Sequence, residues 1–282
     1  MFIDGSSLIF RAFHGVPASV RSPDDRPVNA VRGFMETLTR LLVSRQPRHL
    51  AVASDVDWRP AWRVDLIPAY KSHRVAEPVP RDLEPQMAVI HEYLDAIGID
   101  FIGLADYEAE DLISTWTATT SGTVDIVSGD RDLYALIEDP RVRILYPEKG
   151  GLAEVDEAEV TRRYGIPGRR YADFAVLRGD PSDGLPGLKG VGAVSAAQMI
   201  RTHGGIDGLL EAGRLTEAQR DYVERALRVV QPVTDLPVTL PQGRRDLYPV
   251  DAAALAALTA RNGLASASER LVEALTTVLA AP

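Results

Sequence analysis

Residues 124–132 read Val124-Asp-Ile-Val-Ser-Gly-Asp-Arg-Asp132, a short strand-like run that ends at once in glycine and acids. Two earlier runs end in the same way: Phe2 and Ile3 lead into Asp4, and Leu50 to Ala53 leads into Asp55. Val142 to Leu145 is a further strand candidate. Short runs of this kind, bounded by turn-forming residues, are typical of β-strands.

Helical patterns lie between these runs. Apolar residues recur at helical spacing twice, at positions 31, 34, 38 and 41 and at positions 83, 87, 90, 94 and 97. Alternation of strands and helices is typical of a parallel sheet with helices on its faces. The sequence therefore predicts an α/β core, with a mostly parallel sheet and flanking helices, over residues 1–165.

The pattern changes after Pro167 to short helical pieces broken by glycine and proline. A longer helix is expected from Thr216 to Val230, with Thr216 as its N-cap and Pro232 as its stop. The alanine-rich residues 251–281 favour helix as well. We expect three parts: the core 1–165 including the segment 58–81, a helical subdomain 166–250, and a helical tail 251–282.

Composition excludes several classes of chemistry and of location. The chain of 282 residues has no cysteine, which rules out disulfides, thiolate zinc sites and a cysteine nucleophile. Its longest uncharged run, residues 112–124, is too short to span a bilayer, so a cytoplasmic protein without a membrane partner is expected. The net charge of −9 opposes nucleic-acid binding only if the acids are spread over the surface.

Several of the acids are predicted to meet. Asp4, Asp55 and Asp130 each follow a strand, and the carboxyl ends of parallel strands share one edge of a sheet, where α/β folds bind ligands. Acidic residues also open a helix and a loop, at Glu108, Glu110, Asp111, Asp132, Asp180 and Asp183. Crowded carboxylates resist ionisation unless cations neutralise them. Because the ligands are oxygens and no histidines pair, Mg²⁺ or Mn²⁺ is expected, with two or more ions suited to phosphodiester cleavage.

Each acidic motif also has a purely structural interpretation. Acids at a helix start stabilise the helix dipole, and Asp after a strand is often a turn or cap residue. Their convergence on one predicted edge favours the metal site.

Residues 58–81 form a basic stretch in an acidic chain, with five Lys or Arg, two acids and interleaved Trp58, Trp62 and Tyr70. Cations for phosphates and aromatic rings for bases suit a single-strand channel. The alternative is an ordinary exposed helix whose long side chains lie over apolar surface.

Five motifs together resemble the 5′ nuclease family, which includes the 5′-3′ exonuclease domain of bacterial DNA polymerase I, phage 5′ nucleases and flap endonucleases. They are Ile3-Asp-Gly5, Trp62-Arg63 with Tyr70-Lys-Ser-His-Arg74, Tyr107-Glu-Ala-Glu-Asp111, Ser128-Gly-Asp-Arg-Asp-Leu133, and the loop Gly179 to Gly192. The chain resembles a stand-alone relative of the polymerase domain, with a PIN-like core and a helix-turn-helix variant.

The resemblance implies roles for named residues. The metal ligands would be Asp4, Asp55, Glu108, Glu110, Asp111, Asp130, Asp132, Asp180 and Asp183. Arg63 and Lys71 would act on the scissile phosphate, Tyr70 would stack on a base, and Arg74 would hold the strand. Lys189, Gly190, Gly192 and Ser195, in and after the glycine loop, would bind duplex DNA at a site that holds K⁺ in the family.

Three positions depart from the family pattern. Glu110 stands where bacterial members carry Asp, Gly184 replaces an Asn after Asp183, and Ala193-Val-Ser195 replaces a charged pair.

The predicted function is metal-dependent 5′ nuclease action on DNA, at 5′ flaps, nicks and overhangs, in replication and repair. RNA–DNA primer ends are expected substrates too, and the protein is expected to act as a monomer. Two alternatives stay open: a structure-specific DNA-binding protein with weak catalysis, suggested by Gly184 and the short first strand, and a PIN-type ribonuclease that prefers single-stranded RNA.

Overall fold

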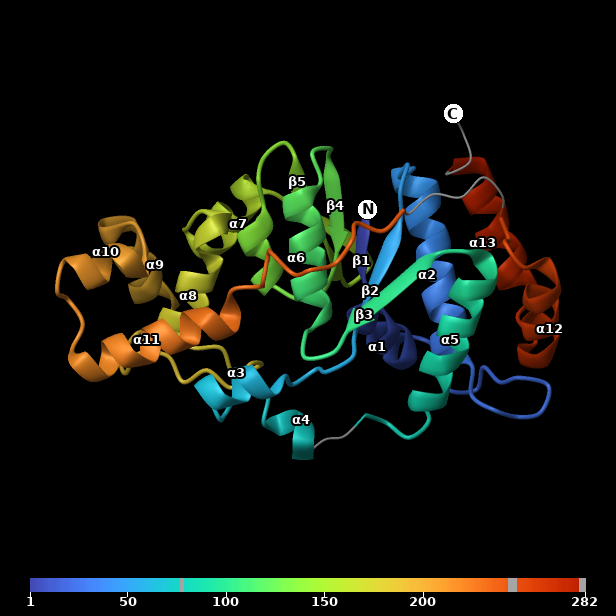
Figure 1. The fold of residues 1–282 in the computed structure, drawn as a ribbon, viewed down its shortest axis with the longest axis horizontal. Coiled ribbons are helices and arrows are strands. Elements are labelled where there is room, and N and C mark those ends of the chain that lie inside the picture. Colours follow the sequence, from blue (N-terminus) through green and yellow to red (C-terminus); the bar gives the residue numbers. More distant parts are fainter. Residues whose placement is uncertain (77–78, 243–247, 279–282) are drawn as a thin grey trace. The chain divides into compact units, whose positions relative to one another are not determined.

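A computed structural model describes residues 1–76, 79–242 and 248–278 (Figure 1). The chain forms two compact units, each assembled from separate segments. The first comprises Met1–Ser54, Val79–Gly103 and Thr239–Pro282, and the second Asp55–Pro78 and Leu104–Val238. Residues 58–78 of the basic segment and residues 166–238 of the predicted helical subdomain thus belong to one unit with residues 104–165 of the predicted core. Residues 79–81 and 239–250 belong to the first unit.

In the first unit, three strands lie in the order β3-β2-β1. They are β1 (Phe2–Asp4), β2 (Ala51–Asp55) and β3 (Asp100–Leu104). β1 and β2 are parallel, with Ile3 opposite Val52. The connection between them runs through two helices, α1 (Gly5–Gly15) and α2 (Asn29–Arg45), as parallel neighbours require.

Helices pack against one another over the apolar faces expected from the sequence. α2 contacts α5 (Glu84–Ile97), and the two C-terminal helices α12 (Ala252–Asn262) and α13 (Ala265–Val278) contact α5 and α2 respectively. Leu271 and Leu275 of α13 are fully buried. The predicted helical tail therefore forms two helices that complete the first unit, and residues 279–281 of that prediction lie outside the described residues.

In the second unit, β4 (Val124–Val127) is parallel to β5 (Val142–Glu148), which pairs antiparallel with β6 (Gly151–Val155). α6 (Ala109–Thr119) precedes β4, and a short 3₁₀ helix, η1 (Asp132–Leu136), follows it. α7 (Glu157–Tyr164) follows β6. A mostly parallel α/β arrangement is confirmed, although β3, β6 and α7 were not predicted.

Among the remaining helices of the second unit, α8 (Tyr171–Arg178) has contacts with several neighbours. It contacts α9 (Ala193–His203) and α11 (Glu217–Val230), while α10 (Ile206–Glu211) packs on α9. η2 (Gly168–Arg170) leads into α8, and α3 (Ala61–Leu66) packs on α11, followed by α4 (His73–Ala76). Thr216 caps α11 as predicted, accepting the backbone N–H of Gln219.

Across the described residues, no helix combines the length and the apolar character needed to cross a membrane.

Candidate metal and nucleic-acid site

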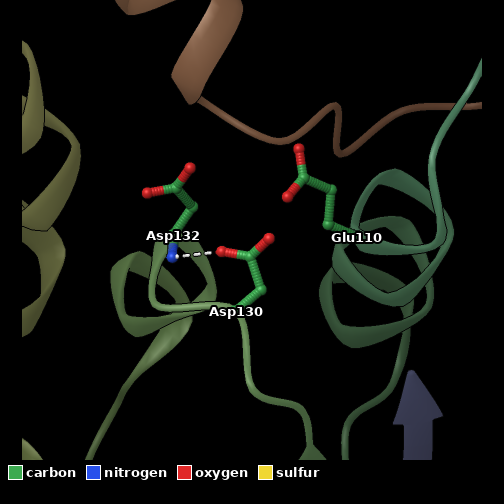
Figure 2. A group of neighbouring side chains, drawn as sticks. All are labelled: Glu110, Asp130 and Asp132. Carbon is green, nitrogen blue, oxygen red and sulfur yellow. Dashed lines mark hydrogen bonds between the residues drawn. The ribbon is translucent and has the colours of Figure 1, made fainter. Parts of the chain in front are cut away.

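The end of β4 presents two acids on a tightly folded turn. Ser128 Oγ accepts the N–H of Asp130 at 2.9 Å, and Asp130 Oδ1 accepts the N–H of Asp132 at 2.9 Å. These bonds fold residues 128–132 back so that η1 starts at Asp132. Figure 2 shows both carboxylates on the same side of this turn.

The start of α6 supplies a third acid. Glu108 is the N-cap, and its N–H donates to Asp111 Oδ2 at 3.1 Å, which closes the first turn of the helix. Glu110 projects from this turn toward the acids after β4 (Figure 2). Carboxylate oxygens of Glu110, Asp130 and Asp132 all lie within 4.8 Å of one another. We call these three residues the carboxylate cluster.

Two carboxyls of the cluster are held in an environment that opposes their ionisation. Burial raises the pKa of Glu110 well above its ordinary value, against the attraction of Arg63, and Asp130 raises it further. Burial also raises the pKa of Asp132, as do the neighbouring charges of Asp183 and Asp130. Crowded, buried acids of this kind are stable either protonated or bound to a cation.

The chemistry of these donors fits a hard divalent cation. Carboxylate oxygens are the ligands that Mg²⁺ and Mn²⁺ prefer, and the cluster offers three of them from two rigid elements. The expected all-oxygen metal site thus has a geometric counterpart at Glu110, Asp130 and Asp132.

Arg63 lies beside the cluster and has no exposed surface. Its Nε donates to the carbonyl of Val229 at 3.0 Å, Nη1 to Glu108 and Asp111 at 2.7 and 2.9 Å, and Nη2 to Asp111 at 2.8 Å. Nη2 also lies 3.1 Å from Glu110 Oε1. Four of the five N–H donors of the guanidinium are hydrogen-bonded, and Glu110 adds an ion pair. Burial alone would lower the pKa of Arg63, but the carboxylates raise it above its ordinary value.

Glu108 is the shared acceptor of a second set of contacts. Lys71 Nζ donates to its Oε1 at 2.6 Å, and the hydroxyl of Tyr70 donates to its Oε2 at 2.6 Å. Lys71 also lies 3.8 Å from Asp183 Oδ1. Burial opposes the charge of Lys71, but the carboxylates of Glu108 and Asp183 raise its pKa well above the ordinary value.

Two expected roles do not fit this geometry. Arg63 was expected to contact the scissile phosphate, yet its donors are all directed to carboxylates and to Val229. Tyr70 was expected to stack on a base, yet its side chain is 1% exposed and its hydroxyl is bound to Glu108. Both side chains are buried because carboxylates at the start of α6 need hydrogen-bond donors and charge compensation.

The other predicted acids have contacts of their own. Asp55 Oδ1 accepts the N–H of Ala109 at 2.7 Å, which places Asp55 at the first turn of α6. Asp180 pairs with Arg131 and Arg178 at 3.5 and 3.2 Å. Asp4 belongs to the first compact unit, where it accepts the N–H of Ser7 at 2.9 Å and caps α1.

The departure at Gly184 has a steric reason. Its φ is +72°, and a Cβ at this position would lie 2.0 Å from the carbonyl oxygen of Ala69. The N–H of Lys71 donates to the carbonyl of Asp183 at 3.0 Å in the same contact. A side chain at position 184 would therefore separate the Asp183 turn from the loop that holds Lys71.

The predicted duplex-binding residues lie together on exposed surface. Lys189, Gly190, Gly192 and Ser195 are exposed in the loop before α9 and in its first turn. Gly192 is the N-cap, and Val194 beside it is 83% exposed. Backbone N–H groups at such a helix start can receive an anion.

Some contacts were not predicted from the sequence. Arg131 and Arg178 pair with Asp180, and the carbonyl of Val229 binds Arg63. The sequence held a signal for the contacts of Asp180, because Arg178 stands two positions before it and Arg131 stands beside Asp130. Nothing in the local sequence distinguishes Val229, because a backbone carbonyl acts here.

The comparisons with known proteins define the class. The family model "5′-3′ exonuclease, N-terminal resolvase-like domain" matches residues 1–165, and "5′-3′ exonuclease, C-terminal SAM fold" matches residues 166–250. The chain belongs to the 5′-3′ exonuclease family, which confirms the resemblance drawn from its motifs.

Individual relatives agree with this assignment. The chain is 48% identical to a 5′-3′ exonuclease of Streptomyces coelicolor, over 98% of this chain and 100% of that protein. It is 44% identical to a 5′-3′ exonuclease of Mycobacterium tuberculosis, over 99% and 98% of the two chains. In fold it is similar to the bacteriophage T5 flap endonuclease, solved as a pseudo-enzyme-product complex with DNA and metal ions (TM-score 0.68, 16% identity, 99% and 98% coverage).

Proposed function

We propose that this chain is a metal-dependent 5′ nuclease that hydrolyses phosphodiester bonds of DNA at 5′ flaps and 5′ ends. The carboxylate cluster carries this proposal: three acids from two elements lie within 4.8 Å of one another, beside the buried cation of Arg63. The names of the two relatives at 44–48% identity support the 5′-3′ direction.

Glu110, Asp130 and Asp132 would hold a divalent ion, Mg²⁺ or Mn²⁺, and further carboxylates of the predicted set would hold a second. When bound, the ions would activate water for attack on the phosphate and stabilise the leaving oxygen. Metal ions in the T5 flap endonuclease complex support the choice of cofactor class.

Lys71 and Arg63 have different roles in this proposal. Lys71 is the cation assigned to the scissile phosphate. Its side chain is buried like that of Tyr70, but its ammonium has three N–H donors, one of which is hydrogen-bonded to Glu108. Arg63 is a positioning residue, because its donors fix the acids at the start of α6 relative to α11.

DNA would bind along two surfaces of the second unit. The exposed loop before α9, with Lys189, Gly190, Gly192 and Ser195, suits the backbone of a duplex, with K⁺ as an additional ligand. Arg74 would hold the single strand. The subdomain 166–250 is then the duplex-binding part and the core 1–165 the cleaving part. DNA in the T5 complex supports this class of substrate.

In the cell, these activities would remove flaps and RNA–DNA primer ends during replication and repair. The protein would act in the cytoplasm as a monomer, since one chain contains the whole carboxylate cluster.

The proposal is tested with a 5′-labelled flap duplex and its blunt counterpart, each incubated with Mn²⁺, Mg²⁺ or a chelator. Metal-dependent cleavage near the junction is expected from the wild type and should be abolished in Asp130→Asn. Asp125→Asn is the matched control: this acid of β4 pairs with Arg143 on the surface, and its loss should leave cleavage unchanged.

Other results would overturn the assignment. Equal cleavage by Asp130→Asn, or cleavage in chelator, would exclude the cluster as the catalytic site. Tight flap binding without cleavage would establish a DNA-binding protein, and faster cleavage of single-stranded RNA would establish a ribonuclease.

A further inference from the structure

Trp58 is held on a backbone segment that is fixed from both sides. Before it, Asp57 Oδ2 accepts the N–H of Asp106 at 2.8 Å. After it, Arg59 donates to the carbonyls of Tyr70 and Pro68 at 2.7 and 3.0 Å. The hydrogen bonds of Arg59 thus connect the residue after Trp58 to the loop that leads into Lys71.

The indole of Trp58 is half-buried, and the guanidinium carbon of Arg74 lies over its ring, 5.9 Å from the ring centroid. Arg74 is itself only half-buried, in the short helix α4. The neighbouring side chains of Val56 and Val75 are 53% and 67% exposed. Residues 56–58 and 74–75 therefore present an aromatic ring, a cation and apolar side chains that are accessible to solvent.

Two other aromatic residues of this segment are engaged elsewhere. Tyr70 is buried against Glu108. Trp62 donates its indole N–H to the carbonyl of Asp106 at 3.0 Å, and the buried guanidinium of Arg63 lies over its ring at 4.6 Å. Trp58 is the aromatic residue of the segment whose cation partner is accessible to solvent.

We propose that Trp58 and Arg74 form a nucleotide-binding subsite, in which Trp58 stacks on a nucleobase of the 5′ single strand and Arg74 binds the adjacent phosphate. The ligand class follows from the chemistry, because an aromatic face beside a guanidinium matches a base and its phosphate. This inference rests on the proposed function. It assigns to Trp58 the base stacking that was expected of Tyr70, which is buried.

The test uses 5′-flap duplexes that contain 2-aminopurine or an abasic site at one position at a time around the junction. Binding is measured in the Asp130→Asn background, in which cleavage is blocked. At one position, 2-aminopurine fluorescence should be quenched on binding, and Trp58→Ala should abolish this quenching. Trp58→Phe, which keeps a stacking ring, should retain most of it.

Affinity gives a second readout. Trp58→Ala should weaken binding of the intact flap at least about fivefold, the lower end of a base–aromatic stack. The same substitution should have no effect on a flap that is abasic at the quenched position. Val43→Ala, which shortens an exposed valine of α2 outside the segment, should behave like the parent protein in both assays.

Equal weakening of intact and abasic flaps by Trp58→Ala would overturn the subsite, as would unchanged quenching. Either result leaves the nuclease assignment intact, because cleavage by the wild type is scored separately. Absence of wild-type cleavage would instead refute the proposed function, while position-specific quenching would still test Trp58.

Discussion

Arg63 shows how one side chain can organise several acids. Its guanidinium donates four hydrogen bonds, to Glu108, Asp111 and the carbonyl of Val229, and forms an ion pair with Glu110. Val229 lies more than 100 residues after these acids along the chain. A lysine could not reproduce this planar arrangement of donors. The guanidinium therefore acts as a fixed internal cation at the edge of the carboxylate cluster.

Removal of this cation should be costly. Arg63→Ala leaves buried carboxylates without compensation, so the free energy of unfolding should fall by about 3–5 kcal/mol. Urea unfolding of the metal-free protein measures this loss. Arg63→Lys should recover part of the stability. A loss below about 1 kcal/mol, typical of an exposed pair, would contradict the buried geometry.

The close contact between Gly184 and Ala69 predicts that a side chain at position 184 destabilises the protein. Gly184→Ala adds a Cβ where only 2.0 Å separates it from a carbonyl oxygen, so the loop bearing Lys71 must move. Gly213→Ala is the matched control, because Gly213 also has positive φ, at +61°, but nothing lies within 4 Å of its added Cβ. Gly184→Ala should cost about 1–3 kcal/mol more than the control.

Urea unfolding of both variants separates the clash from backbone strain. Equal losses of unfolding free energy in Gly184→Ala and Gly213→Ala would mean that the loop bearing Lys71 moves aside without an energetic cost. Gly184→Ala should also slow flap cleavage, since Lys71 and Asp183 share this contact.

At the scale of helices and strands, the sequence predicted what local patterns encode. β4 and α11 have the expected bounds, because an apolar run and a capping box are local signals. β6 was missed because it is largely exposed and pairs with one neighbour, so it needs no apolar alternation. The sequence also did not predict which acids would be bound by cations instead of joining the carboxylate cluster. Glu108, for example, is bound by Arg63, which lies 45 residues before it in the chain.

The cap of α11 should matter beyond its own turn, because this helix supplies the carbonyl that binds Arg63. Thr216→Ala removes the acceptor of the Gln219 N–H and should lower the free energy of unfolding by about 1 kcal/mol. Thr216→Ser, which keeps the hydroxyl, should retain most of the stability. Thermal unfolding of the two variants compares them, and equal melting temperatures would contradict a capping role.

Across the whole molecule, the acidic balance has a local explanation. The carboxylate cluster gathers three acids at one place, and residues 58–81, which are locally basic, supply the buried cations Arg63 and Lys71 beside the start of α6. Stability should consequently depend on metal and on pH together.

The direction in which stability changes with pH follows from the raised pKa values of Glu110 and Asp132. Without metal, the folded protein holds protons that the unfolded chain has released, so stability falls as pH rises above the ordinary carboxyl range. Mn²⁺ replaces those protons. The rise in melting temperature on adding Mn²⁺ should thus be larger at about pH 7.5 than at about pH 5.5.

Differential scanning calorimetry at the two pH values measures this difference, and titration in buffers of different ionisation enthalpy should show proton release. The double substitution Glu110→Gln and Asp132→Asn should remove the pH dependence. An equal Mn²⁺ effect at both pH values would mean that the two carboxyls are already ionised in the metal-free protein.

The bond from Arg63 to Val229 also bears on how the chain can be divided. Asp111 accepts the N–H of Val233 at 2.8 Å in the same region. One backbone group in the last turn of α11 and one just after this helix therefore bind the side chains around α6. A fragment that ends at residue 165 would lose both partners. Arg63 Nε would lose its acceptor, and Asp111 Oδ1 would keep the hydrogen bond from Arg63 Nη2. Cutting the chain at the boundary between the two family models should therefore disturb the contacts around the carboxylate cluster as well as remove the proposed DNA-binding surface.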